Sequence, residues 1–436
     1  MKKIFCLLLA AFVLFCSCAK DEPLPECVRS AERVVYGNRI YSVEPVPDKG
    51  VFLTYTEIGD EEQTAYVGCV DPLCSHGKDE CPAWSGAQGT PVAIVPMKKG
   101  AVVYFYRFID GLVDPDDPGQ GWETRTDLIA FDLSGGKCRT VTSVPARMPG
   151  ETPFLIADGY VYFTINSALF TGDYGAQYVN VWRAPTDGGE LEQITFSEDM
   201  ASAYRLEHYE NGTFYFRRGD TLCRTSDDFA TEELVMEDLN LLWKIEIRDG
   251  WVYYSDEREV ISLTPDEPKA DNYAHVYHYA IGEYPEALDA ANTCSLMRTR
   301  TDGSGVTEKL ASGIATCPNT LAPNWCVMGN TLYCVPARFE LQGTVDWGEF
   351  SSPNSLSYIW SETGGDLLAI DLETGEQREA LSDLGFDILS IIPAGDGRLL
   401  VSGRVYDLDL IREYASTNEI RSSELRYTVW RLLDAE

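Results

Sequence analysis

Basic residues are scarce in this chain. Its 436 residues include 35 Lys and Arg against 69 Asp and Glu, and the formal net charge is −34. A nucleic-acid-binding protein neutralises phosphates with a basic face, so this balance argues against a nucleic-acid partner. It argues equally against electrostatic docking on anionic lipid. Hydrophobic residues are not scarce (44%), so the chain can bury the cores of two or three domains, or of one large repeat domain.

The short motifs of common enzymes are also missing. The chain contains no G-x-S-x-G elbow, no H-E-x-x-H pair, no phosphate-binding loop and no G-x-G-x-x-G turn. Their absence favours a binding protein over an enzyme only modestly. With 69 acidic residues, the chain offers many carboxylate pairs that could cleave a glycoside.

Long apolar runs are absent apart from one near the N-terminus, and that one is short. Lys2 and Lys3 precede an apolar stretch from Ile4 to Phe15, which as a helix spans about 18 Å of the ~30 Å hydrocarbon core. A charged start and a short apolar run are typical of a signal peptide.

The end of this stretch, Phe15-Cys16-Ser17-Cys18, resembles the lipobox of bacterial lipoproteins. The resemblance implies that residues 1–17 are a lipoprotein signal peptide. It also implies that Cys18 carries an acyl group such as palmitate, and that the mature protein is anchored by lipid to a membrane of the cell envelope, outside the cytoplasm. A plain secreted protein is the alternative. Residues 18–30 are polar and rich in proline at their start, which predicts a tether.

Two short patterns alternate seven times along residues 31–436. The first is a turn followed by an alternating aromatic strand, and it begins at Gly37-Asn38, Gly100, Asp158-Gly159, Asn211-Gly212, Asp249-Gly250, Gly329-Asn330 and Asp396-Gly397. Asp-Gly and Asn-Gly supply the positive φ of tight hairpins. The second is an apolar strand that mostly ends in a turn with Asp: Tyr66–Asp71, Leu128–Gly135, Val181–Gly189, Leu222–Asp227, Leu296–Gly305, Leu367–Gly375 and Val429–Asp434.

Two hairpins per unit make a four-stranded sheet, and seven such sheets predict an all-β, seven-bladed β-propeller. A tandem of separate sandwiches is the alternative. The segments Leu296–Leu310 and Val181–Thr195 resemble the TolB-like propeller repeat, which implies the fold and little about activity. Because the seventh unit ends at Glu436, we expect a piece near Leu24–Val35 to complete its blade.

Three long insertions interrupt the repeats, at Ile109–Thr126, Thr264–Thr293 and Arg338–Gly365. Aromatic side chains in the last two could grip a ligand or pack the loops onto the blades. The candidate ligand-binding residues are Tyr273, His275, His278, Trp347 and Trp360.

The architecture predicts a lipid-anchored propeller that binds a protein, peptide or glycan. Two alternatives are a surface polysaccharide hydrolase or lyase with carboxylates on its rim, and a structural lipoprotein of the envelope.

The cysteines give the most specific chemical prediction. Cys69, Cys74, His76 and Cys81 supply three thiols and one imidazole, the donor set of a tetrahedral Zn²⁺ site. A Cys74–Cys81 disulfide is the preferred interpretation for an exported chain, and free thiols are a third.

Three further candidate sites have residue spacings that are less characteristic of a known type of site. Cys326 and Cys334 are a second candidate disulfide, provided that the turn between them holds three residues. His275 and His278 form an incomplete metal pair. The acidic residues from Asp110 to Asp117 could hold Ca²⁺, although a solvated turn is preferred.

Overall fold

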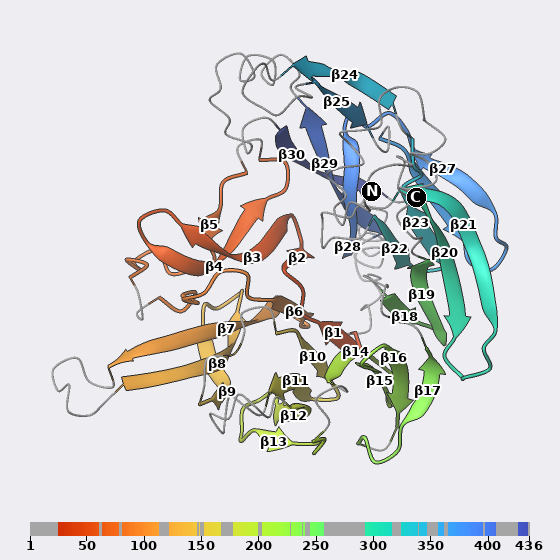
Figure 1. Ribbon diagram of the computed structural model, residues 1–436. Helices are drawn as coiled ribbons and strands as arrows, with labels where there is room; N and C mark the ends of the chain where they lie inside the picture. The colour runs from red at the N-terminus through yellow and green to blue at the C-terminus, as the bar shows by residue number, and fades with distance from the viewer. Residues whose placement is uncertain are drawn as a thin grey trace, which may run out of the picture.

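The computed structural model of the chain describes residues 25–60, 63–77, 81–112, 122–145, 148, 152–166, 178–198, 203–226, 228–237, 239, 245–256, 293–315, 324–338, 340–346, 356–361, 365–395, 397–406 and 426–434. These residues form β-strands and no α-helix. The strands build seven sheets around a common centre, which confirms the predicted seven-bladed β-propeller (Figure 1).

Each blade is an antiparallel sheet whose strands follow one another along the chain. Blade 1 contains β2 (Arg33–Tyr36), β3 (Arg39–Val46), β4 (Gly50–Glu57) and β5 (Tyr66–Val67), and blade 2 contains β6 (Val92–Pro96), β7 (Ala101–Leu112), β8 (Trp122–Asp132) and β9 (Cys138–Val144). Blade 3 contains β10 (Phe154–Ala157), β11 (Tyr160–Asn166), β12 (Val179–Pro185) and β13 (Glu192–Gln193). Blade 4 contains β14 (Tyr204–Glu210), β15 (Thr213–Arg218), β16 (Thr221–Thr225) and β17 (Glu233–Met236).

Blade 5 contains β18 (Ile245–Arg248), β19 (Trp251–Asp256), β20 (Thr293–Arg300) and β21 (Thr307–Ala315). Blade 6 contains β22 (Trp325–Met328), β23 (Thr331–Cys334), β26 (Leu367–Asp371) and β27 (Gln377–Leu381). Blade 7 contains β28 (Asp387–Gly395), β29 (Arg398–Tyr406) and β30 (Arg426–Asp434). A separate hairpin of β24 (Glu340–Asp346) and β25 (Leu356–Ser361) extends from blade 6. The seventh blade has three strands among the described residues.

The predicted turns have the expected backbone. Asp158 and Gly159 both have positive φ (47° and 78°) and connect Ala157 directly to its partner Tyr160. Asn211-Gly212 and Asp249-Gly250 repeat this geometry. Two consecutive residues with positive φ give the turn whose twist matches that of the two flanking strands. The sequence pattern therefore located the hairpins correctly.

Apolar side chains fill the spaces between the blades. Seven clusters of buried residues lie in the described chain, one between each pair of neighbouring blades. Side chains alternate across a strand, so Val161 and Phe163 of β11 face blade 2, whereas Tyr162 faces blade 4. No blade buries both of its faces alone, so the fold depends on the complete ring.

The ring closes by packing between blades 1 and 7. Ile40 of blade 1 packs against Ala394 and Leu400 of blade 7. The described residues contain no strand shared between these two blades. The expectation that Leu24–Val35 completes the seventh blade is therefore wrong: β2 is the first strand of blade 1, and β1 (Cys27–Arg29) pairs with β10 of blade 3.

The segment from Cys27 to Ala31 instead joins several blades at the centre of the ring, where β1 lies beside β10 and β14 (Figure 1). The Ser30 amide donates to the Phe154 carbonyl (2.9 Å), and Ala31 exchanges two backbone hydrogen bonds with Val92 of blade 2 (2.8 and 2.7 Å). These bonds cover inner strand edges that would otherwise be unpaired. We call residues 27–31 the N-terminal clasp; most of it lies within the segment that was expected to be a tether.

The two sides of the ring differ in their connections. The turn face carries the turns between first and second strands, such as 158–159, and the loop face carries the connections between second and third strands. All three predicted insertions interrupt the chain where a second strand passes to a third, at β7–β8, β19–β20 and β23–β26, and these strand ends lie on the loop face. The first insertion includes the ends of β7 and β8 themselves. Cys27 lies opposite Ala157, the last residue before a turn of the turn face. The chain therefore reaches β1 from the turn face.

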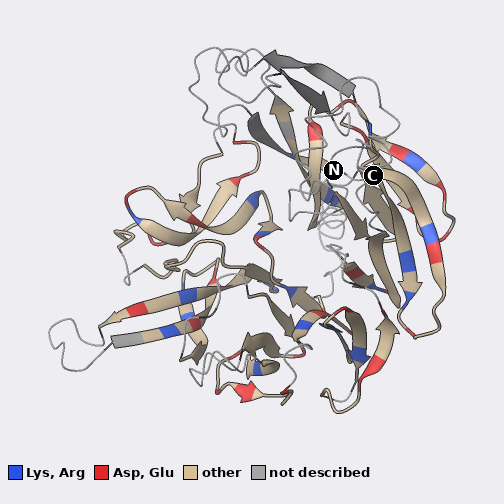
Figure 2. Ribbon diagram, viewed as in Figure 1, with Lys and Arg blue, Asp and Glu red and all other residues tan. Residues whose placement is uncertain are grey.

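Arginines on some third strands pair with the outer strand of their own sheet, and Arg298 also reaches the next sheet. Arg298 of β20 pairs with Glu308 on the neighbouring outer strand (2.6 Å), and it donates to the Leu372 carbonyl of blade 6 (3.1 Å). Arg183 of β12 pairs with Glu192 in the same way (2.9 Å). Basic and acidic residues accordingly lie side by side on outer strands (Figure 2). The same kind of ion pair recurs at Arg183, Arg224 and Arg298, each on the third strand of its blade.

Aspartates in three of the repeat turns predict an acid-sensitive contribution to stability. Asp132, Asp302 and Asp371 each accept a backbone amide from a residue two or three positions ahead, at 2.7–2.9 Å. Hydrogen bonds from Ser134, Ser304 and Thr374 lower the pKa of these carboxyls below the ordinary value. A lowered folded-state pKa stabilises the fold above the unfolded pKa, and the contribution is lost as pH falls through the folded value.

We therefore expect the melting temperature to decrease as the pH is lowered below about 4, where aspartates ordinarily become protonated. The fall should be shallower in the triple variant Asp132→Asn, Asp302→Asn and Asp371→Asn. Thermal denaturation between pH 3 and 6 measures it. An unchanged slope in the triple variant would show that other carboxyls cause the acid sensitivity.

Candidate metal centre

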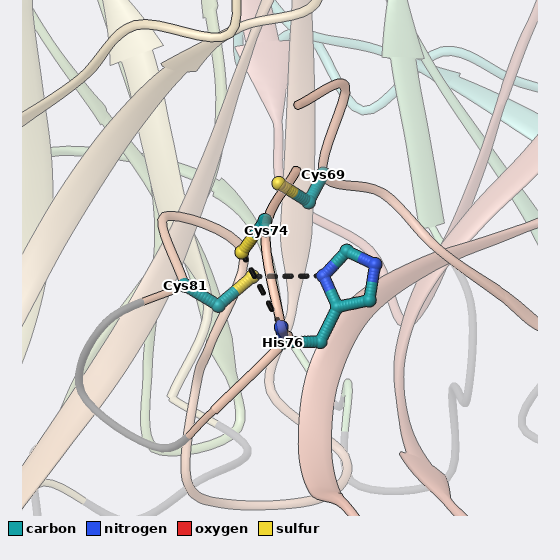
Figure 3. A group of neighbouring side chains, drawn as sticks. All are labelled: Cys69, Cys74, His76 and Cys81. Carbon is teal, nitrogen blue, oxygen red and sulfur yellow. Dashed lines mark hydrogen bonds between the residues drawn. The ribbon is translucent and has the colours of Figure 1, made fainter. Parts of the chain in front are cut away.

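Three cysteines and one histidine converge in the connection between blades 1 and 2. Cys69 follows β5, and the intervening Gly68 donates its amide to the Leu53 carbonyl (2.8 Å). None of the described residues between 68 and 91 belongs to a strand, and irregular connections longer than about 15 residues are uncommon in compact domains. Within this connection Cys69, Cys74, His76 and Cys81 meet (Figure 3).

Local turns place each donor. The Cys74 amide donates to the Asp71 carbonyl (3.2 Å), which closes a turn between the first two cysteines. His76 has a positive φ of 53°, an uncommon conformation for a histidine. Cys81 is buried and packs against the cluster that contains Phe52 and Trp84 between blades 1 and 2. The centre is therefore attached to the apolar core rather than to a free loop.

The distances suit a tetrahedral ion. The four potential ligand atoms all lie within 4.8 Å of one another. Zn–S bonds near 2.3 Å and Zn–N bonds near 2.0 Å place tetrahedral ligands roughly 3.5–3.8 Å apart. Cys81 Sγ lies 3.6 Å from His76 Nδ1, and the His76 amide donates to Cys74 Sγ at 3.4 Å. Three thiols and one imidazole fill a structural zinc site and leave no position open for a substrate.

Burial affects the thiols unequally. It raises the pKa of Cys69, and it raises the pKa of Cys81 to about 12, where the neighbouring thiols add to the effect. Neighbouring thiolates repel one another, and a bound cation would relieve that repulsion.

The structure bears on both of the candidate disulfides. Cys69 and His76 lie beside the predicted Cys74–Cys81 pair, so the four residues have the geometry of a metal site, while the disulfide and free thiols stay as alternatives. The second predicted disulfide, Cys326–Cys334, is wrong. Met328 pairs directly with Thr331, so the turn holds two residues rather than three.

This register changes which residues meet. Cys334 lies opposite Trp325, and Cys326 lies opposite Tyr333. Cys326 packs towards blade 7 and Cys334 towards blade 5. A one-residue difference in register moves side chains to opposite faces of a sheet.

The remaining predicted site residues are not tested by the structure. Cys18, Tyr273, His275, His278 and Trp347 lie outside the described residues, and for Trp360 the backbone alone is described, within β25. At the proposed calcium loop, Asp110 accepts a hydrogen bond from Thr124 (3.1 Å) on the paired strand. The cysteine–histidine cluster is the one group with metal-binding geometry in the described part of the chain.

The sequence did not reveal a cluster of charged residues formed by Arg29, Arg205, Glu207 and Arg217. Glu207 interrupts the apolar alternation of its strand, which is the one signal that could have drawn attention to it. Arg205 and Arg217 lie on the two strands of one hairpin, whereas Arg29 is far from them in the sequence. The arrival of Arg29 depends on the path of the N-terminal clasp.

No helix that could cross a membrane occurs in the described part of the chain. No protein-family model and no curated protein sequence matches the chain.

Several solved structures share similarity with the chain. A protein from Agrobacterium tumefaciens described as a TolB is 10% identical, with a TM-score of 0.29, over 63% of this chain and 79% of its own. An oligogalacturonate lyase from Vibrio parahaemolyticus is 9% identical, with a TM-score of 0.36, over 88% of this chain and 91% of its own.

A third neighbour is a variant of the apocarotenoid oxygenase of Synechocystis. It is 13% identical, with a TM-score of 0.31, over 87% of this chain and 66% of its own length. At such low identity and TM-score these likenesses carry no argument about activity, and the assignment as a seven-bladed propeller rests on the strands and sheets of this chain.

Proposed function

We propose that this protein is a lipid-anchored binding module of the cell envelope, which presents the loop face of its propeller to a protein, peptide or glycan. One observation carries the proposal. The chain reaches the ring from the turn face, whereas the three long insertions belong to the loop face. We therefore assign attachment and recognition to opposite sides of the ring.

The length of the tether supports this orientation. Nine residue steps separate Cys18 from Cys27, and an extended chain of that length spans at most about 30 Å. An acyl group on Cys18 would therefore keep the turn face close to the bilayer. The loop face would point away from the membrane, towards its ligand.

The metal centre has a structural role in this proposal. A closed set of three thiolates and one imidazole holds zinc without leaving a catalytic position. Zinc bound there would fix the connection between blades 1 and 2 against their shared core cluster.

The test pairs binding with catalysis. The purified protein is screened on glycan and peptide arrays, and the same sugars are assayed for product release. We expect saturable binding without products, weakened by Trp347→Ala with Trp360→Ala on the loop face. Val306→Ala, which changes an exposed residue in a turn of the turn face, is the matched control. Release of shortened or unsaturated sugars would identify a hydrolase or lyase instead.

The anchor itself gives a separate prediction. Replacing Cys18 by Ala removes the only acceptor for the acyl group in the proposed lipobox, so the protein is expected to move from the membrane fraction to the soluble fraction. Cell fractionation with immunoblotting measures the change, and Cys16→Ala is the control that should remain with the membranes. A Cys18→Ala protein that still sediments with membranes would contradict the lipid anchor.

A further inference from the structure

A buried carboxylate at the centre of the ring is surrounded by three arginines. Glu207 has 1% of its side chain exposed, and its Oε2 lies 2.6 Å from Arg29 Nη1. Its Oε1 lies 2.7 Å from Arg217 Nε and 3.3 Å from Arg205 Nε. Among the described residues, Glu207 is the one ion-pair partner of Arg29 and of Arg205.

Local strand geometry explains the convergence. Arg205 of β14 lies directly opposite Arg217 of β15, and like charges in opposed positions are unfavourable. The register of this pair shifts between Leu206 and His208. The bulge leaves Glu207 without a partner residue on β15 and turns its carboxylate towards the two arginines, a common use of a bulge. Arg29 arrives separately, on β1 of the N-terminal clasp.

Basic side chains gather here in a strongly acidic protein. Among the described residues, Arg29 and Arg205 have Glu207 as their ion-pair partner, and Arg217 shares that carboxylate. The next acidic residue on the strand, Glu210, is engaged elsewhere, because its oxygens accept the amides of Asp249 (2.8 Å) and Gly250 (3.4 Å). Burial lowers the pKa of Arg217, and Arg205 and Arg29 lower it further, against the opposing effect of Glu207. The arginines therefore repel one another despite the shared carboxylate.

Two of the arginines remain accessible, with 54% of the Arg205 side chain and 33% of the Arg29 side chain exposed. Arg205 is the second residue of β14 and Arg217 the last but one of β15, so both lie at the strand ends that meet the loop face.

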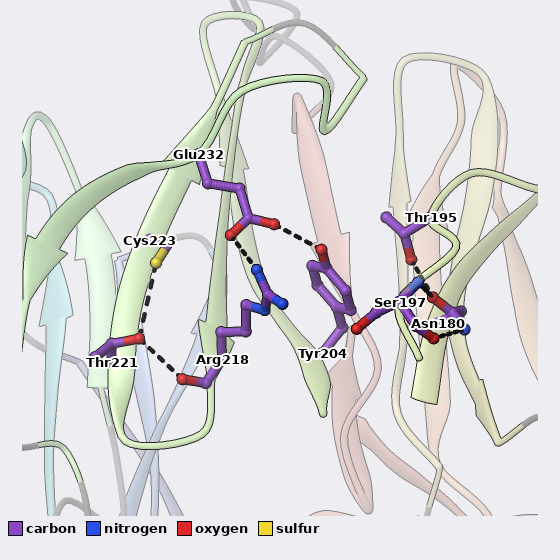
Figure 4. Close-up of polar contacts among 8 residues, drawn as sticks. All are labelled: Asn180, Thr195, Ser197, Tyr204, Arg218, Thr221, Cys223 and Glu232. Atoms are coloured by element: carbon purple, nitrogen blue, oxygen red, sulfur yellow. Dashed lines mark hydrogen bonds and ion pairs between the residues drawn. The ribbon is translucent and has the colours of Figure 1, made fainter. Parts of the chain in front are cut away.

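Neighbouring contacts hold this strand end in place (Figure 4). Tyr204 donates to Glu232 (2.6 Å), which also pairs with Arg218 (2.7 Å), and Asn180 accepts the Ser197 amide (2.7 Å) in the connection that precedes β14. The start of β14, which carries Arg205, is therefore tied to its own blade and follows a braced connection.

We propose that Arg29, Arg205 and Arg217 form a binding site for an anionic group, a carboxylate or a phosphate, carried by the ligand of the loop face. The site rests on the proposed function in that it names the chemistry recognised at the centre of that face. A guanidinium presents five N–H donors in a planar fork that matches carboxylate and phosphate oxygens. Glu207 holds the forks together, and the incoming anion accepts hydrogen bonds from the accessible guanidinium groups of Arg29 and Arg205.

Inorganic phosphate and citrate are the probes, because they carry the two chemistries without a macromolecule. Binding to the purified protein is measured by calorimetry and by thermal shift at constant ionic strength, with chloride as the reference anion. We expect saturable binding and a raised melting temperature with at least one probe, and the tighter probe identifies phosphate or carboxylate as the preferred group. Arg205→Gln should weaken binding at least tenfold.

Arg33→Gln is the matched control, since Arg33 has a comparable exposure (42%) and pairs with Glu44 (3.6 Å) but lies in blade 1. It should bind within twofold of the wild type. Glu207→Gln should melt lower than the wild type without anions and gain more from phosphate or citrate, because three cations then lack their carboxylate. A residue that served stability alone would not produce this greater gain. If Arg205→Gln fails to fold, Arg29→Gln replaces it.

Absence of saturable binding in both the wild type and Glu207→Gln would overturn the site, as would unchanged affinity in a folded Arg205→Gln or Arg29→Gln protein. These outcomes are independent of the array screen. A protein that binds phosphate or citrate yet no glycan, peptide or protein would retain the anion site and refute the proposed binding partner.

Discussion

If zinc binds the cysteine–histidine cluster, the Cys81→Ser protein is expected to bind none and to melt well below the wild type. Cys81 is buried, and it contributes both a ligand atom and packing between blades 1 and 2. Zinc that binds the folded chain alone stabilises it by about 4 kcal/mol when the free metal is a thousand times the Kd. Elemental analysis measures zinc per chain, and thermal denaturation with and without a chelator measures the stability.

Cys138→Ser is the control for this change. Cys138 is exposed on β9 and does not belong to the cluster, so this variant should keep one zinc per chain and the wild-type melting temperature. A zinc-free wild type in which Cys74 and Cys81 are alkylated only after reduction would establish the disulfide instead. A zinc-free protein with all thiols reactive would establish free cysteines.

Leu400→Ala is expected to lower the free energy of unfolding by about 3 kcal/mol, within the usual range for a buried leucine. Leu400 is fully buried at the closure between blades 1 and 7. That cluster has only three buried members among the described residues, so each of them carries a large share of the closure. Because no described strand bridges the two blades, lost packing there is not compensated by backbone hydrogen bonds.

Urea denaturation of Leu400→Ala measures this effect, with Leu234→Ala as the control. Leu234 is half exposed on the outer strand β17, and surface substitutions of this kind usually change stability by less than about 0.5 kcal/mol. Equal losses in the two variants would show that the closure is not a weak point of the ring.

Local features of the sequence determined the blades. Asp158-Gly159 and its counterparts require positive φ at two consecutive residues, which so few residue types tolerate that the hairpins could be located without a structure. Alternating strands such as Tyr160–Asn166 then had two apolar faces to bury, and stacking blades into a ring buries both. The cysteine–histidine cluster was equally visible, because its four residues lie within thirteen positions of one another.

The tertiary structure decided which distant segments meet. β1 could have paired with any free inner edge, and hydrogen bonds at Ser30 and Ala31 place it against blades 2 and 3 rather than blade 7. A turn of two residues rather than three keeps Cys326 and Cys334 from lying opposite each other. Arg29 reached Glu207 because the clasp crosses the centre of the ring. Turn residues and alternation act within a few positions of the chain, whereas the pairing of β1 with β10 and the contact of Arg29 with Glu207 join residues more than a hundred positions apart.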